Sequence, residues 1–187
     1  MPNNAAIYYD PTDDGATTTK KEFEVLPEGK YFCHIVDYME PVINLTKKNG
    51  DLCNILKLVL TIDANKHPQY ADRKIWADVW VTLEKNGKQP SSSDNQGFGK
   101  FLDAIHYPCD KTQVEINGVT KEVNILPFGV DEIDEDHIVG KPLLATTYIS
   151  NWTGKDGSAK QTAKVRFFDS WDNGEPLEQE EDDDLPF

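Results

Sequence analysis

Two stretches of sequence decide the fold: LCNILKLVLTI at residues 52–62 and RKIWADVWVT at residues 73–82. Apolar residues recur at alternate positions in both, which is the period of a β-strand with one buried face. The first stretch leaves Lys57 outside, and the second leaves Trp76, Asp78 and Trp80 outside. The pattern predicts two strands of an antiparallel sheet. The inward residues are Leu52, Leu56, Leu58, Leu60 and Ile62 in the first and Ile75, Ala77, Val79 and Val81 in the second.

The flanking sequence extends this sheet in both directions. A strand is expected at residues 30–38, and a helix over residues 94–107, where four apolar side chains share one face. A hairpin joined by Asn117 and Gly118 is expected next. Two long strands at residues 142–152 and 161–168 complete the pattern.

Three strands, a helix and two strands is the order of the five-stranded OB-fold barrel, so we expect a mainly β protein of that architecture. An immunoglobulin-like sandwich needs about seven strands and no such helix. The sequence divides into a flexible N-terminal arm (residues 1–22), the OB-fold domain (residues 23–171) and a disordered acidic tail (residues 172–187). The segment at residues 111–139 exceeds what a minimal barrel needs.

The outward faces of the predicted strands carry aromatic rings on one strand and cations on another. In the last strand, alternation turns Phe167 inward with its apolar neighbours and turns Phe168 outward, although a one-residue bulge would swap the two faces. Stacking platforms beside a cationic track are typical of single-stranded nucleic-acid binding. The candidate DNA-binding residues are Trp76, Trp80, Lys57, Arg73, Lys74, Lys47, Lys48, Tyr148, Trp152, Lys155, Lys160, Lys164, Arg166 and Phe168.

The net charge of −14 would ordinarily argue against a nucleic-acid partner, but the acid is concentrated near the ends. Seven acids and no base lie in residues 175–187, two more acids precede them, and three lie in residues 1–19. Residues 20–168 hold the other 21 acids and all 19 bases, a net charge of −2. A segment as acidic as residues 175–187 is expected to stay extended in water.

The last six residues are Asp182, Asp183, Asp184, Leu185, Pro186 and Phe187. An acidic run followed by a hydrophobe, Pro and Phe resembles the C-terminal peptide of bacterial and bacteriophage single-stranded DNA-binding proteins. That resemblance implies an OB fold that coats single-stranded DNA, and a tip that recruits replication, recombination and repair proteins. The family's long Gly/Pro/Gln-rich linker is missing, because residues 174–176 lead directly into acid. The family's tetramer is therefore not carried over, and a homodimer stays open.

No enzymatic or cofactor-binding pattern emerges from the sequence, so a protein that is not an enzyme and has no cofactor or metal is expected. The glycines at residues 154–157 lack phosphate-loop spacing, and the acidic stretch at residues 131–137 lacks the pattern of a calcium loop. Three scattered cysteines without a secretory leader indicate reduced thiols in a cytoplasm, that of a bacterium or a phage-infected host. The longest apolar runs fall far short of the ~20 residues of a membrane span.

Two classes of function remain in competition. The first is a single-stranded DNA-binding protein that protects DNA and recruits partners through its tip. The second is an acidic interaction module or DNA mimic that competes for DNA-binding or tip-binding proteins. The cationic strand at residues 160–166 favours the first class, because a mimic of DNA has no need of a basic face.

Overall fold

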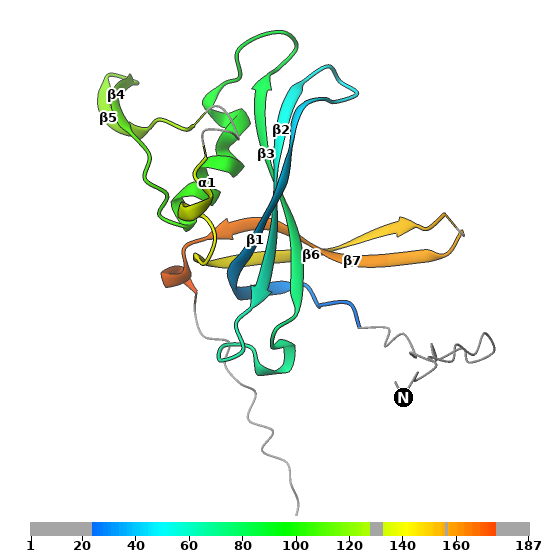
Figure 1. The fold of residues 1–187 in the computed structure, drawn as a ribbon. Coiled ribbons are helices and arrows are strands. Elements are labelled where there is room, and N and C mark those ends of the chain that lie inside the picture. Colours follow the sequence, from blue (N-terminus) through cyan, green and yellow to red (C-terminus); the bar gives the residue numbers. More distant parts are fainter. Residues whose placement is uncertain (1–23, 128–132, 156, 175–187) are drawn as a thin grey trace, which may run out of the picture.

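The computed structural model describes residues 24–127, 133–155 and 157–174 (Figure 1). The expected mainly β fold with one α-helix is confirmed: within these residues, seven strands form two antiparallel sheets. The elements in chain order are β1 (Gly29–Thr46), β2 (Leu52–Ile62), β3 (Lys74–Glu84), α1 (Gln96–Ala104), β4 (Lys111–Ile116), β5 (Val119–Asn124), β6 (Pro142–Thr153) and β7 (Ala159–Asp169). The expected N-terminal arm and the acidic tip lie outside the described residues.

The larger sheet has the strand order β3-β2-β1-β6-β7, with β3 and β7 at its edges. The long strand β1 joins its two halves, because Gly29–His34 pair with β6 while Cys33–Thr46 pair with β2. Three register shifts along the β1–β2 ladder allow the sheet to bend. Figure 1 shows the β6–β7 hairpin crossing the direction of β2 and β3. In the part of the chain that the structure describes, β3 and β7 do not pair, so the sheet is not closed into a barrel.

The alternation predicted for β3 is confirmed, and the inward leucines predicted for β2 are buried, although Ile55 and Val59 on the outward side of β2 are buried as well. Leu56, Leu58 and Leu60 are at most 1% exposed, whereas Trp76 and Trp80 on the other face are 63% and 41% exposed. Leu52 is an exception: it lies beside a register shift in the β2–β3 ladder and is only half-buried. The inner face of the sheet therefore forms the core and the outer face presents the two tryptophans.

Helix α1 covers the core where the edge strands approach each other. Its buried side chains are Phe98, Phe101, Leu102 and Ala104, and it contacts both β3 and β7. It is shorter than the sequence predicted at both ends, because a 3₁₀ turn over Ser92–Asn95 precedes it and His106 adopts a positive φ of 52° after it. The Asn95 side chain accepts from Thr82 N (2.7 Å) and donates to Thr82 O (2.9 Å), which fixes the helix start against β3.

A bulge in β7 reverses the predicted orientation of two phenylalanines. Thr146 pairs with Phe167 and Thr147 with Val165, so Arg166 is the extra residue. Phe167 is consequently 54% exposed, while the Phe168 ring packs at 5.2 Å from the Phe101 ring. The prediction of an inward Phe167 and an outward Phe168 was wrong, because the bulge shifts the alternation by one residue.

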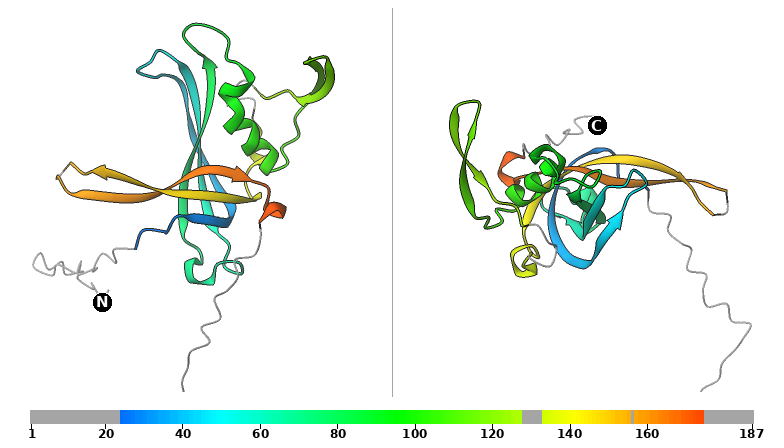
Figure 2. Two further views of the ribbon diagram at one scale, coloured as in Figure 1. Left: turned by 180° about the vertical axis from the view of Figure 1, so that it is seen from behind. Right: turned by 90° about the horizontal axis from the view of Figure 1, so that it is seen from above.

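The hairpin predicted within the long insertion is confirmed as β4–β5. Asn117 and Gly118 both adopt positive φ, 54° and 76°, as a two-residue turn of this kind requires. Figure 2 shows this hairpin standing away from the larger sheet on the side of α1, opposite to the projecting end of the β6–β7 hairpin.

Candidate nucleic-acid interface

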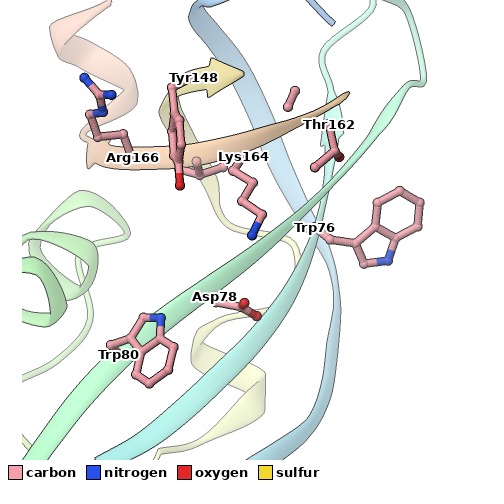
Figure 3. A pocket seen from close by; sticks show the side chains of 9 residues that line it. Trp76, Asp78, Trp80, Tyr148, Thr162, Lys164 and Arg166 are labelled. Atoms are coloured by element: carbon pink, nitrogen blue, oxygen red, sulfur yellow. The ribbon is translucent and has the colours of Figure 1, made fainter. Parts of the chain in front are cut away.

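A groove of about 690 Å³ lies between β3 and the β6–β7 hairpin (Figure 3). Its walls come from the outer face of β3 and from β7, with one side chain from β6. The residues that line it are Trp76, Asp78, Trp80, Tyr148, Thr162, Ala163, Lys164, Val165 and Arg166. Five of these, Trp76, Trp80, Tyr148, Lys164 and Arg166, are candidate DNA-binding residues from the sequence, and the fold brings them together.

The β3 wall consists of the outward row Trp76, Asp78 and Trp80. In the β2–β3 ladder, Val59 lies opposite Trp76 and Ile55 lies opposite Trp80. Both aliphatic side chains are only 6% exposed, so the tryptophans stand beside a dry apolar surface. Such support holds a ring in one orientation while its free face stays available for stacking.

A lysine from the β1–β2 turn accompanies the second tryptophan. Lys47 Nζ lies 4.5 Å from the centre of the Trp80 ring, which is a cation–π distance. Lys48, the next residue of the same turn, is exposed. Lys57, opposite Asp78 in the ladder, is half-buried between the two tryptophan positions. A cationic border therefore follows the β3 wall.

The facing wall carries an aromatic–cation pair of its own. Tyr148 lies opposite Lys164 in the β6–β7 ladder, and the Arg166 guanidinium carbon is 5.0 Å from the centre of the Tyr148 ring. Figure 3 shows the Lys164 side chain extending from β7 towards β3. Both cations are exposed, so they are available to phosphate groups that enter the groove.

The same pairing recurs at the projecting end of the β6–β7 hairpin. Trp152 is 50% exposed and lies opposite Lys160, whose Nζ is 5.4 Å from the Trp152 ring centre. Lys155 is exposed in the adjoining turn. A second hollow of about 470 Å³ adjoins Trp152 and Lys160. The predicted residues of this hairpin thus form an outlying group beyond the main groove.

Two further predicted cations, Arg73 and Lys74, lie where β3 begins. The Arg73 side chain donates to Glu24 O and lies 5.9 Å from the Tyr70 ring centre, so it holds the entering chain as well as facing solvent. Arg73 and Lys74 line a smaller hollow together with Trp76, which connects them to one end of the groove.

Phe168 does not belong to this interface. It packs against Phe101 and lines a different hollow near Lys30 and Lys100. The bulge at Arg166 is the physical reason, as described above. Asp78 lines the groove but was not among the candidate residues from the sequence. The alternation of β3 had placed it on the outward face between two tryptophans, and this position could have identified it.

A few titratable groups outside the groove make local contacts or are buried. His34 Nε2 lies 2.9 Å from Asp63 Oδ2, and the pKa of Asp63 is lowered by hydrogen bonds from His34 and two backbone amides, which outweigh its desolvation. Burial raises the pKa of the Cys33 thiol to about 12, so that thiol is unreactive at neutral pH. The Asp134 carboxylate accepts from Asp136 N and contacts His137 Nδ1 at 2.8 Å.

No group of three or more His, Cys, Asp or Glu side chains in the described ranges is arranged to hold a metal ion. No helix in residues 24–127, 133–155 or 157–174 is long and apolar enough to cross a bilayer. The acidic stretch at residues 131–137 is covered only from residue 133 onward.

Comparison with known proteins adds no relative: no family model matches the chain, and no curated protein matches it significantly.

Proposed function

We propose that this chain is a non-catalytic single-stranded DNA-binding protein that protects DNA during replication, recombination or repair. The observation that carries the proposal is the groove between β3 and β7, which is lined by exposed aromatic rings of β3 and by exposed cations of β7. Stacking on aromatic rings and neutralisation of phosphates are the two contributions that sequence-tolerant single-strand binding needs.

An OB-type fold belongs to the same proposal. The order β3-β2-β1-β6-β7, with a helix between the third and the next long strand, agrees with a five-stranded OB sheet left open between β3 and β7. Oligonucleotides bind to OB folds on the outer face of the middle strands and the adjoining loops. The tryptophans of β3 and the lysines of the β1–β2 turn lie in that region.

Single strands suit this groove better than duplex. In a duplex the faces of the bases are stacked on each other, so Trp76 and Trp80 would have no base to receive. A duplex would still contact the cations, but through phosphates alone. We therefore expect a preference for single strands that depends on the aromatic side chains.

The second part of the proposal concerns the C-terminal tip, which lies outside the described residues. By its resemblance to the tips of single-stranded DNA-binding proteins, Asp182–Phe187 recruits replication, recombination or repair proteins. Phe187 would supply most of the binding energy by inserting into a pocket of the partner, whereas the aspartates would make exposed contacts that salt screens. Removing Phe187 should abolish capture of such proteins, whereas Asp183→Ala should weaken capture only modestly, and mostly at low salt.

The competing function is an acidic module or DNA mimic. A mimic presents negative charge where a DNA-binding protein expects phosphate. The groove presents Lys164 and Arg166 instead, together with exposed aromatic rings, so the described surface favours DNA binding over mimicry.

The test is a binding titration of fluorescent oligo-dT and of a duplex of equal length at two salt concentrations. We expect tighter binding of oligo-dT and a steep salt dependence. Removing two phosphate contacts by Lys164→Ala with Arg166→Ala should reduce the log–log salt slope by up to about 1.4. Lys111→Ala with Lys121→Ala removes two exposed cations from the β4–β5 hairpin and should leave the slope unchanged. Equal binding of both nucleic acids, or of neither, contradicts the proposal.

A further inference from the structure

Asp78 occupies an unexpected position for a carboxylate. It lies in the middle of the β3 wall, between Trp76 and Trp80, in a groove whose opposite wall is cationic. Figure 3 shows its side chain between the two indoles. A negative charge here repels phosphate, so it opposes the purpose of a groove that serves the nucleic-acid backbone alone.

The structure provides no local use for this carboxylate. Among the described residues, no side chain forms an ion pair or a hydrogen bond with Asp78, although Lys57 lies opposite it in the ladder and Lys164 extends towards it. The residue is exposed and lines the groove. Asp78 is therefore available to a ligand that brings hydrogen-bond donors.

The neighbouring tryptophan determines what that ligand can be. Trp76 is 63% exposed and makes none of the ring–ring or cation–ring contacts found in residues 24–127, 133–155 and 157–174. Lys47 already lies over Trp80. Trp76 is thus the freer stacking platform, and Asp78 is two residues away, about 7 Å along the strand. A base stacked on Trp76 would present its edge to Asp78.

We propose that Asp78 selects guanine at the position stacked on Trp76. An ionised carboxylate is only an acceptor, with two parallel oxygens. In a single strand the Watson–Crick edge of each base is free. Guanine presents two adjacent donors on that edge, the N1–H and the N2 amino group, which fit both oxygens in a bidentate, charge-assisted pair.

The other bases fit the carboxylate less well. Adenine and cytosine offer one amino group each, beside a ring nitrogen that is an acceptor and faces the carboxylate unfavourably. Thymine offers a single N–H flanked by two carbonyl oxygens. The inference rests on the proposed function and deepens it, because it assigns a base preference to a groove otherwise expected to tolerate any sequence.

The experiment compares oligo-dT of about 12 nucleotides carrying one central guanine, inosine or adenine with oligo-dT alone. Inosine keeps the N1–H but lacks the N2 amino group, so it matches guanine in size and stacking. We expect the full-length protein to bind the guanine oligonucleotide about fivefold more tightly than the inosine one, the lower end for a bidentate pair. Adenine should be no better than inosine, which separates the carboxylate contact from purine stacking.

The variant Asp78→Asn should abolish the guanine–inosine ratio while binding oligo-dT at least as tightly as the wild type, because a repulsive charge is removed. Asp136→Asn makes the same chemical change at an exposed site outside the groove and should keep the ratio. A ratio near one in the wild type, or a ratio that survives Asp78→Asn, overturns the inference while the proposed function stands. Failure of the wild type to bind any of the oligonucleotides overturns the proposed function itself.

Discussion

Replacing Trp76 by Ala should weaken binding of oligo-dT while the protein stays folded. The ring is 63% exposed, so only about a third of its surface is buried against the protein. A tryptophan side chain can bury up to about 250 Å², so this third corresponds to roughly 2 kcal/mol or less of folding free energy at 25 cal/mol per Å². A domain with a stability of about 5–15 kcal/mol tolerates that loss.

The loss of binding free energy on removal of the Trp76 ring should be comparable to this loss of folding free energy, or larger. Stacking of a base on an aromatic ring contributes about 1–3 kcal/mol, so its loss corresponds to a roughly 5- to 150-fold larger dissociation constant. Fluorescence anisotropy of labelled oligo-dT at fixed salt measures this change, and a thermal melt checks the fold.

A matched control is available elsewhere on the sheet. Phe167 is 54% exposed, close to the exposure of Trp76, but it lies outside the groove. Phe167→Ala should leave the affinity for oligo-dT unchanged. If Trp76→Ala binds oligo-dT as tightly as the wild type, or if Phe167→Ala weakens binding equally, the stacking role assigned to the β3 wall is refuted.

Three further predictions concern stability and the tail. His67 is fully buried and accepts a hydrogen bond from Phe32 N, and burial lowers its pKa. The unfolded chain therefore binds a proton more readily, so urea midpoints should fall as the pH drops below about 6.5, and His67→Gln should lose that pH dependence. A Cβ at Gly174 would approach Phe32 Cζ at 2.2 Å, so Gly174→Ala should lower the free energy of unfolding by about 1–3 kcal/mol, whereas the open Gly97→Ala should not. Deleting residues 175–187 should tighten oligo-dT binding at low salt, because tethered acids compete with phosphates for the groove, and the gain should shrink as salt is raised; weaker binding on deletion would contradict this.

The alternation of single strands was readable from the sequence because a period of two depends on each strand alone. The buried leucines of β2 and the exposed Trp76 and Trp80 of β3 follow directly from it. The helix face with Phe98 and Phe101 was readable for the same reason. Each of these predictions needs only local spacing and a core on one side.

Features that depend on the pairing of strands were not readable. Phe167 and Phe168 are adjacent, and only the register with Thr146 and Thr147 decides which of them faces the core. The same holds for the pairs of Trp152 with Lys160 and Tyr148 with Arg166, which require the β6–β7 ladder. The sequence indicated aromatic and cationic side chains separately, and the sheet brings them into contact.

The openness of the sheet is a further feature that the element order could not predict. Three strands, a helix and two strands are compatible with a closed barrel or with an open sheet. In the structure, β3 and β7 approach each other without pairing, and α1 contacts both. The groove lies between these two edges, so the site depends on the sheet being open between β3 and β7.

The most direct test of the central claim uses the indole N–H signals of the four tryptophans in a ¹⁵N-labelled sample. Trp76 and Trp80 line the groove, whereas Trp171 packs at 4.8 Å from the Phe32 ring and at 5.1 Å from the His34 ring, away from it. Assigned by single substitutions and titrated with oligo-dT, the signals of Trp76 and Trp80 should shift and that of Trp171 should stay in place. A shift confined to Trp171, or no shift of Trp76 and Trp80 at saturating oligo-dT, would contradict the account.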